Sequence, residues 1–477
     1  MDYKKDVKEI IAFIKCGCPD ESDRNYHDCL ARFTCVTEDD YLNSRAVHII
    51  SEINNSKELE DAFSRLAFSC NNQIIPCKAC TVRKYCNHYI NNRRKETSET
   101  SPKMIDLFCG AGGLSLGFTQ EGFITALAND IEECCIDTYS HNHPETPRSH
   151  IVKGDIQQIT DNLEKLVEGI DIDIIVGGPP CQGFSMANRQ RLIDDPRNHL
   201  YKSFVETVRR VSPAFFVMEN VKGMISVAPQ VKEDFEAIGY EVNYEVLNAK
   251  DFGVPQNRER LIYIGNRIGV DNREVFGEIH HYSETIPDYY LKDAIFGLRE
   301  LEASRVKNAT EKGSDTSGYL IERNLNNVTN EYIDMINSGR NISVVCNHKA
   351  RYNNDRDIEI FGRLEQGDRS DDPKIADIMP YARRNDIFKD KYYKLEMDKV
   401  SKTITAHMKF DCNMYIHPTQ ARGLTPREAA RIQSYPDDYF FRGSYTKTYM
   451  QIGNSVPPLL GRAIARAIKK YLTEALS

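Results

Sequence analysis

A cysteine that could act as a nucleophile lies in the segment Gly177-Gly178-Pro179-Pro180-Cys181-Gln182-Gly183-Phe184-Ser185. It follows the apolar run 173–176, which is typical of a buried strand. The glycine and proline residues around Cys181 predict a turn at the carboxyl end of that strand, where open α/β sheets bind their ligands. A thiol presented to such a cleft can attack a substrate if its pKa is lowered. A proline–cysteine turn can equally be structural, so the interpretation depends on the other motifs.

A glycine turn at 109–113 is the second motif that could form part of a functional site. It follows a short apolar strand, 104–108, and precedes a helical pattern that continues through Phe118. A bare backbone in this position lets a nucleotide-type ligand approach closely. Two acids follow the next strands: Asp130 could accept hydrogen bonds from ribose hydroxyls, and Asp155 could meet an adenine amino group. Each carboxylate could instead cap a helix.

The elements that must position these residues are short apolar segments that alternate with helical patterns. This alternation predicts an α/β fold with a doubly wound parallel sheet and helices on both faces. Beyond the strand that precedes the glycine turn, the predicted strands are 124–128, 151–154, 172–176, 214–218 and 260–264. The tail 459–476 has the apolar spacing of a packed helix.

Composition limits the class of protein. The chain has 477 residues, 40% of them hydrophobic and 28% charged, which is typical of a globular protein. Its apolar runs fall far short of the ~20 residues that cross a bilayer, and its amino terminus does not resemble a signal peptide. We therefore expect a cytoplasmic protein without membrane partners, whose cysteines are metal ligands, catalytic groups or core residues. The net charge of −8 gives no global signal for nucleic acid, but a local basic surface would suffice.

From about Lys103 to the carboxyl terminus, roughly four-fifths of the chain, the sequence resembles the cytosine carbon-5 DNA methyltransferases. The resemblance is specific because eight motifs occur in the family's order. They are DLFCGAGG (106–113), ND (129–130), GD (154–155), GPPCQGFS (178–185), ENV (219–221), QNRER (256–260), LTPRE (424–428) and QIGNSVP (451–457).

The resemblance implies a catalytic set. Cys181 would add to carbon 6 of cytosine, which makes carbon 5 nucleophilic toward a methyl sulfonium. Glu219 would bind or protonate ring nitrogen 3. Arg258 and Arg260 would stabilise charge at the ring carbonyl, although either could form a structural ion pair instead. Because carbon 6 is inaccessible inside a duplex, the cytosine must rotate out of it, and residues 186–197 resemble the loop that closes over the base.

The resemblance also implies S-adenosylmethionine as the cofactor, bound by a Rossmann-like methyltransferase domain. Phe108 would stack on the adenine, and Asn454 would complete the pocket from the last motif. The full set of expected cofactor residues is Asp106, Phe108, Gly110, Gly112, Gly113, Asp130, Asp155, Pro180 and Asn454.

The predicted domain order follows from the same comparison. Residues 1–101 form a cysteine-rich domain with its linker, 102–268 the first catalytic part, 269–400 an inserted target-recognition domain, and 401–477 the return to the catalytic domain. The inserted segment contains the basic stretches 348–351 and 381–385, which we expect to contact double-stranded DNA. We expect a monomeric enzyme of a restriction–modification system, associated with the nucleoid in a bacterium. The alternatives are an RNA cytosine methyltransferase and a non-catalytic DNA-binding protein of the same fold.

Four cysteines near the amino terminus have the spacing C-x6-C-x2-C-x5-C, at Cys70, Cys77, Cys80 and Cys86. This spacing resembles the 4Fe–4S loop of endonuclease III and MutY type DNA glycosylases, over about 20 residues. Four thiolates on a short loop can hold a 4Fe–4S cluster or a zinc ion, and unliganded cysteines are the third possibility. A cluster would fold a small domain, and the basic segment 78–95 could add a contact to phosphate.

Overall fold

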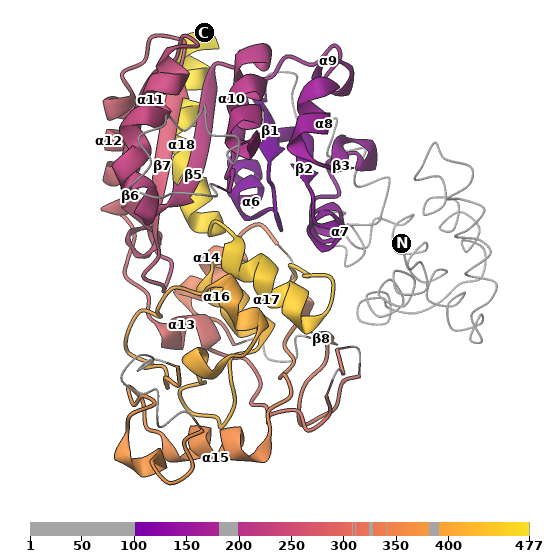
Figure 1. Ribbon diagram of the computed structural model, residues 1–477, viewed down its shortest axis with the longest axis vertical. Coiled ribbons are helices and arrows are strands. Elements are labelled where there is room, and N and C mark those ends of the chain that lie inside the picture. Colours follow the sequence, from indigo (N-terminus) through magenta and orange to yellow (C-terminus); the bar gives the residue numbers. More distant parts are fainter. Residues whose placement is uncertain are drawn as a thin grey trace, which may run out of the picture.

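The computed structural model describes residues 101–180, 199–307, 309–310, 312–323, 328–340, 342–380 and 391–476. Figure 1 shows two lobes in this part of the chain. The sheet lobe contains residues 101–283 and 458–476, and the second lobe contains residues 291–454, each over its described positions. The predicted nucleophile Cys181, the loop 186–197 and the amino-terminal cysteines lie outside the described residues.

The sheet lobe is built on a seven-stranded sheet in the order β3-β2-β1-β4-β5-β7-β6. Neighbouring strands from β3 to β5 are parallel, whereas β7 is antiparallel to both β5 and β6. This confirms the predicted α/β fold with a mostly parallel sheet. The strands are β1 (Lys103–Leu107), β2 (Ile124–Asp130), β3 (Ile151–Lys153), β4 (Ile174–Gly177), β5 (Phe215–Val221), β6 (Glu241–Asn248) and β7 (Glu259–Asn266).

The expectation of a uniformly parallel sheet is wrong at its last two strands. The connection between β6 and β7 contains only η7 (Ala249–Phe252), and it is too short for the crossover that parallel neighbours require. The two strands therefore pair as antiparallel neighbours, with Asn248 opposite Glu259. Strand β6 was not predicted at all, although Val242, Tyr244 and Val246 alternate with polar residues in the pattern of a half-buried strand.

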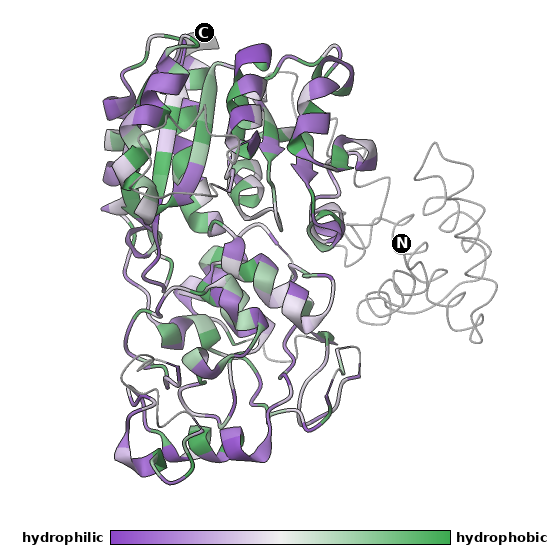
Figure 2. Cartoon of the chain, viewed as in Figure 1, coloured by the Kyte–Doolittle hydropathy of each residue, from purple (hydrophilic) through white to green (hydrophobic). Residues whose placement is uncertain are grey.

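Strands β1, β2, β4 and β5 bury side chains on both faces of the sheet, because successive side chains point to opposite sides and helices cover both faces. Met104 packs with the helices of one face, while Ile105 and Leu107 pack with those of the other. Figure 2 shows apolar residues concentrated on the strands and polar residues on the outer sides of the helices. One face carries α6 (Gly113–Gln120), α12 (Asn272–Ser283) and α18 (Pro458–Leu476); the other carries α8 (Ile156–Asp161), α10 (His199–Val211) and α11 (Ala228–Glu236).

Helix α18 confirms the packed helix that we predicted over 459–476. It lies against α6 so closely that a methyl group on Gly117 would overlap the backbone at Pro458, Gly461 and Arg462. Leu460, Ile464 and Ile468 are fully buried along this contact. The end of the chain therefore completes the layer that the glycine turn begins.

The second lobe contains short helices and a two-stranded sheet of β8 (Ile321–Arg323) and β9 (Val344–Cys346). Helix α16 is anchored by a capping box in which the Thr425 side chain accepts from the backbone of Glu428 and the Glu428 side chain accepts in return. Arg422 binds both carboxylate oxygens of Glu428, at 2.8 and 2.7 Å. The helices are α13 (Leu291–Ile295), α14 (Glu331–Ile336), α15 (Asp355–Arg363), α16 (Pro426–Ile432) and α17 (Tyr445–Asn454).

The boundaries between the lobes differ from the sequence division. Helix α12 lies in the predicted recognition segment, yet Val275, Phe276 and Ile279 pack in the same core as α18 and the sheet. Conversely, α16 and α17 lie in the predicted return to the catalytic domain but belong to the second lobe (Figure 1). The remaining elements are α7 (Glu133–Asn142), α9 (Leu163–Leu166), η3 (Arg148–His150), η6 (Lys222–Val227), η8 (Pro373–Ile375), η10 (Ala406–Lys409) and η11 (Asn413–Tyr415).

Candidate active site and cofactor turn

The predicted cofactor turn connects β1 to α6 and has an unusual backbone. Phe108 has a φ of 57°, a left-handed conformation that non-glycine residues rarely adopt and that is commonly found at functional sites. Gly112 has a φ of 83°, and a Cβ there would lie 2.7 Å from His143 Nε2. A Cβ on Gly110 would point into open space. The turn is therefore packed from below at Gly112 and open at Gly110, where a ligand can approach the backbone.

Asp130, at the end of β2, holds this turn in place. Its Oδ2 accepts a hydrogen bond from the Gly110 N–H at 2.9 Å, and its Oδ1 accepts from the Glu132 N–H at 2.8 Å. Burial raises the pKa of Asp130, although these two backbone donors oppose the shift. Ile131, the next residue, is 64% exposed. Ile131 was not among the residues that we predicted for this site. The signal that could have found it is its position, since it is an apolar residue directly after the acid that ends a strand.

Asp155 caps a helix, which is one of the two roles that its sequence position suggested. Its Oδ1 accepts from the Gln157 N–H at 2.9 Å at the start of α8, and the side chain is half-buried. Asn129, at the end of β2, donates to the carbonyls of Val152 and Gly154, both at 3.0 Å. These bonds hold the carboxyl ends of β2 and β3 side by side, so that Asp130 and Asp155 share one edge of the sheet.

Asp106 lies beneath the turn and is only 1% exposed. Ser115 donates to its Oδ2, and the Tyr139 hydroxyl donates to Ser115 Oγ at 2.7 Å. Burial raises the pKa of Asp106 to about 7. These contacts give Asp106 a supporting position under α6, rather than the direct contact with a cofactor that we expected.

The last motif returns to the cofactor turn, as the sequence predicted for the final segment. A Cβ on Gly113 would overlap the Val456 carbonyl oxygen and the Tyr435 hydroxyl. Asn454, the last residue of α17, is exposed on the same connection. The first and last motifs are thus in direct contact, and Asn454 is available to a ligand at the turn.

Glu219 and Arg260 form an ion pair at the carboxyl end of β5. Arg260 Nε lies 2.7 Å from Glu219 Oε1, and each side chain is 13% exposed. A methyl group on Gly178 would lie 2.9 Å from Glu219 Oε2, so the segment after β4 runs directly beside this carboxylate. The pair is accessible but largely shielded from water, which strengthens its electrostatic effect on a bound ring.

The chain between β4 and the predicted nucleophile is held by a residue that sequence reasoning missed. Asn220 is 8% exposed, and its Nδ2 donates to the Pro179 carbonyl at 3.2 Å. Pro180 follows and is exposed. Asn220 lies in the ENV motif, from which we assigned only the glutamate. Cys181, one residue beyond Pro180, lies outside the described residues.

Arg258 has a different environment from the Glu219–Arg260 ion pair, although only Glu259 lies between Arg258 and Arg260 in the sequence. Its side chain is fully buried, and its guanidinium donates to the carbonyls of Ile404 at 2.7 Å, Gly453 at 2.9 Å and Ser455 at 2.7 Å. Burial lowers its pKa to about 9, so the group stays charged at neutral pH. These contacts favour the structural alternative over a contact with substrate.

The basic stretch 348–351 does not face outward as we predicted. His348 and Lys349 are each 1% exposed, and Lys349 Nζ donates to the Thr310 carbonyl at 3.1 Å and the Tyr445 hydroxyl at 2.8 Å. The prediction failed because charge alone does not distinguish a surface cation from one that satisfies buried carbonyls. The stretch 381–385 lies outside the described residues.

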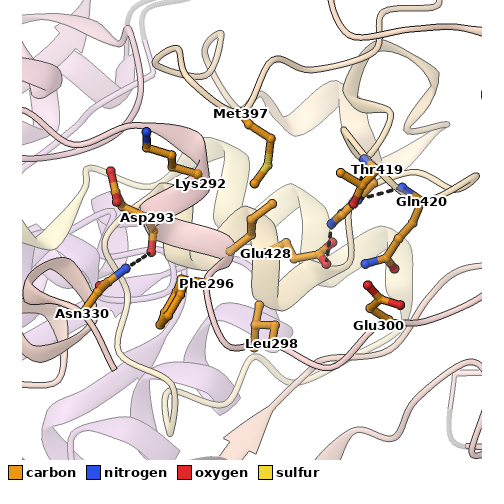
Figure 3. Close-up of a pocket in the computed structure, with 12 residues that line it drawn as sticks. Lys292, Asp293, Phe296, Leu298, Glu300, Asn330, Met397, Thr419, Gln420 and Glu428 are labelled. Carbon is orange, nitrogen blue, oxygen red and sulfur yellow. Dashed lines mark hydrogen bonds and ion pairs between the residues drawn. The ribbon is translucent and has the colours of Figure 1, made fainter. Parts of the chain in front are cut away.

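A cavity of about 420 Å³ lies in the second lobe and contains none of the predicted site residues (Figure 3). Its buried acid, Glu428, is already neutralised by Arg422. Its buried histidine, His417, accepts hydrogen bonds at Nδ1 from the N–H groups of Thr419 and Gln420, at 3.2 and 3.1 Å. These polar groups therefore support the fold.

Two general findings complete the description. Among the residues that the structure describes, no group of three or more His, Cys, Asp or Glu side chains is arranged to hold a metal ion. The predicted metal ligands Cys70, Cys77, Cys80 and Cys86 fall outside that part of the chain. No helix in the same described ranges has both the length and the apolar character needed to cross a bilayer.

Comparison with known proteins agrees with this geometry. The family model for C-5 cytosine-specific DNA methylases matches residues 102–470. The Type II methyltransferase M1.HphI of Haemophilus parahaemolyticus is 37% identical over 379 residues, which cover 77% of this chain and 87% of that protein. M.DdeI of Desulfomicrobium norvegicum, also a Type II methyltransferase, is 34% identical over 395 residues, 77% of this chain and 88% of that protein.

A solved structure extends the likeness to the fold. It is described as a DNA modification methyltransferase encoded within a prophage of E. coli. Its TM-score is 0.61 at 26% sequence identity, and the alignment covers 78% of this chain and all of that one.

Proposed function

Because this chain belongs to the family of C-5 cytosine-specific DNA methylases, we propose that it methylates carbon 5 of a cytosine that is rotated out of a specific duplex DNA sequence. It is a DNA (cytosine-5-)-methyltransferase of the restriction–modification type, as its Type II relatives indicate. The observation that best supports the detailed mechanism is the Glu219–Arg260 ion pair beside the segment that leads to Cys181.

The proposed reaction begins when the Cys181 thiolate forms a bond to carbon 6 of the cytosine. The electron pair of the 5,6 double bond moves to carbon 5, which becomes nucleophilic; a bound S-adenosylmethionine would supply the methyl group to that carbon and would leave as the thioether. A water molecule then removes the proton from carbon 5, and the bond to Cys181 breaks as the double bond re-forms. Glu219 holds or protonates ring nitrogen 3 during the addition, and Arg260 keeps that carboxylate in position.

S-adenosylmethionine, when bound, supplies the electrophilic methyl sulfonium. The residues around the turn fit this cofactor because the backbone at Gly110 is open and Ile131 offers an exposed apolar surface beside it. We assign the adenine contact to Phe108 and Ile131, and the ribose and adenine polar contacts to Asp130 and Asp155. Asn454 and Pro180 would complete the pocket, while Asp106, Gly112 and Gly113 shape it from below.

We further propose that the second lobe and the segment 269–400 read the target sequence, and that one chain acts alone. Sequence-specific readout depends on side chains placed in the major groove, so the target must be measured.

The amino-terminal cysteines remain a separate proposal, supported by their spacing alone. Cys70, Cys77, Cys80 and Cys86 would hold a 4Fe–4S cluster, with zinc as the second choice. Protein purified without oxygen should then be brown, with broad absorbance near ~400 nm. A colourless protein that contains zinc would contradict the cluster. Replacing Cys77 should destabilise the residues before 100 far more than the sheet lobe.

Two experiments test the methyltransferase function. Bisulfite sequencing of DNA from cells that express the full chain should reveal methylated cytosines in one sequence context. A duplex with 5-fluorocytosine at that position should form a covalent adduct through Cys181, because fluorine at carbon 5 cannot leave as a proton does. Cys181→Ser should form no adduct and transfer no methyl groups. Turnover by Cys181→Ser would exclude the assigned nucleophile.

A further inference from the structure

One exposed aromatic side chain lies at the tip of the loop formed by residues 406–411. Phe410 is 64% exposed, which is unusual for a ring of this size. The His407 ring meets it edge-on with the centroids 5.1 Å apart, and Lys409 Nζ lies 5.0 Å from its centre. His407 is itself exposed. The loop thus presents one apolar face with an imidazole ring and a lysine ammonium beside it.

The loop is held rigidly by its flanking residues. Met408 and Cys412 are buried at 0% and 1% exposure, on either side of Phe410. The Arg351 guanidinium donates to the carbonyls of Met408 at 3.0 Å and Phe410 at 3.1 Å. It also lies 5.6 Å from the centre of the Tyr449 ring. The backbone that carries Phe410 is therefore held in place so that the ring is presented to solvent before any ligand arrives.

The loop begins next to the active-site end of the sheet. A Cβ on Gly453 would overlap the backbone of Thr405 and Ala406, so the loop rests on the end of α17. Arg258 joins the Ile404 carbonyl to the carbonyl of Gly453. Arg260 of the catalytic pair is two residues from Arg258. Phe410 is six positions beyond Ile404 in the sequence, which gives a reach of at most about 20 Å.

We infer that Phe410 stacks on a DNA base next to the target cytosine and thereby stabilises the opened duplex. This inference rests on the proposed function, because extrusion of a base exposes the faces of its neighbours. An aromatic ring covers such a face with little dependence on sequence, and nearby cations suit the phosphates. The neighbouring acid, Asp411, accepts from the Asn413 N–H at 3.2 Å within its own turn. The loop lies outside the segment 269–400 that we expected to contact DNA.

The test uses the full chain and a duplex carrying the sequence that bisulfite sequencing identifies. Placing 5-iodouracil or 5-iodocytosine at positions beside the target allows light-induced cross-linking to a stacked aromatic ring. We expect the cross-linked peptide to contain Phe410 and the cross-link to disappear in Phe410→Ala. That variant should raise the Kd for the duplex by about 5- to 100-fold, the range expected for one stacked base. Phe410→Tyr should restore both binding and cross-linking.

Two controls separate the possible failures. Tyr471→Ala removes a partly exposed ring from the carboxyl end of α18, which lies at the end of the sheet lobe away from the second lobe (Figure 1), and should leave Kd unchanged. Unaltered thermal unfolding of Phe410→Ala would exclude a folding defect. If Phe410→Ala binds and methylates the duplex like the parent chain, or unfolds earlier without weaker binding, the inference is wrong while the proposed function stands. If the parent chain methylates no DNA, the proposed function itself fails.

Discussion

Glu219 and Arg260 are the residues to which we assign the central part of the proposed chemistry. They come from neighbouring antiparallel strands, and Arg260 faces Val221 across the ladder. The ion pair is mostly buried, so it is less screened by water and salt than a surface pair. Arg260 fixes the carboxylate in the orientation that an incoming ring would meet. The Glu219 side chain therefore needs no rearrangement before it contacts a substrate.

The charge of this carboxylate is testable with a conservative change. Glu219→Gln retains the shape of the side chain but loses the acid and the ion pair, and we expect kcat to fall by about 10²- to 10⁴-fold. KM for DNA should change little. Glu259→Gln is the matched control, since Glu259 lies on the surface and pairs with Lys222 at 2.8 Å. Steady-state methylation assays of both variants measure these effects. An equal loss of kcat in Glu259→Gln would contradict a specific role for the Glu219 carboxylate.

Single residues also mark the limit of sequence prediction. The acids at the strand ends, Asp130 and Asp155, were found because parallel strands bring their carboxyl ends to one edge. The separate roles of Arg258 and Arg260 could not be derived, because the deciding carbonyls belong to residues about 150 to 200 positions away. The burial of His348 and Lys349 could not be predicted either, because the residues that they contact are also distant in the sequence.

Among the elements, the start of β7 and the end of α17 are joined by one side chain. Arg258→Met would leave three buried carbonyls without a donor, each worth about 1 kcal/mol or more. We expect the free energy of unfolding to drop by at least about 3 kcal/mol, and cofactor binding to weaken because Asn454 shifts.

Arg273→Met is the control for that change. Arg273 is exposed and pairs only with Asp271 among the interactions described, so its removal should leave the free energy of unfolding nearly unchanged. Denaturant unfolding followed by circular dichroism measures both. Loss of turnover in Arg258→Met without loss of stability would mean that the guanidinium acts on substrate after all.

The turn before α16 should make the second lobe sensitive to acid. Burial lowers the pKa of His417 to about 4, and protonation at Nδ1 would break the two hydrogen bonds that it accepts. Its pKa in the unfolded chain is near 6.5. Between these values the unfolded chain binds a proton that the folded chain does not, so stability falls as pH falls.

We expect the free energy of unfolding to fall by about 2 kcal/mol between pH 7 and pH 5 because of His417. His417→Asn keeps an acceptor for Thr419 and Gln420 but does not titrate. Its loss of stability over the same interval should be smaller than that of the parent chain by this amount. Glu428 does not interfere, because Arg422 outweighs burial and holds its pKa below the ordinary value, so its carboxylate stays charged over this interval. Identical pH dependence in the two chains would contradict the assignment.

The sheet shows how far element-level patterns reach. Strands β1 to β5 follow from their apolar runs, and the helices between them require the parallel arrangement. The direction of β7 follows only from the length of the connection after β6, a strand whose half-polar face made it inconspicuous. The boundaries of the second lobe depend on the elements against which the helices pack: α12 contacts α18 and β6, whereas α16 contacts α13 and α17. That choice is made by packing and is not local in sequence.

At the scale of the whole molecule, the contact between α6 and α18 closes the sheet lobe. Gly117→Ala should reverse the usual preference of helices for alanine, because the added methyl would overlap the backbone of α18. We expect a loss of several kcal/mol in unfolding free energy. Gly277→Ala in α12 is the matched control, since nothing lies within 4 Å of its Cβ, and it should stabilise by up to about 1 kcal/mol. Thermal unfolding of both variants provides the comparison, and similar Tm values would show that α18 can move aside.

The position of α18 has a consequence for synthesis. The ribosome releases the chain from its amino end, so β1, β4 and β5 emerge long before the helix that covers one of their faces. Until the last 19-residue helix appears, residues such as Met104, Val176 and Val217 lack part of their covering layer. Nascent chains of this enzyme should therefore expose apolar surface, prone to aggregation, from the synthesis of these strands until α18 emerges. We expect them to depend on chaperones until that helix docks.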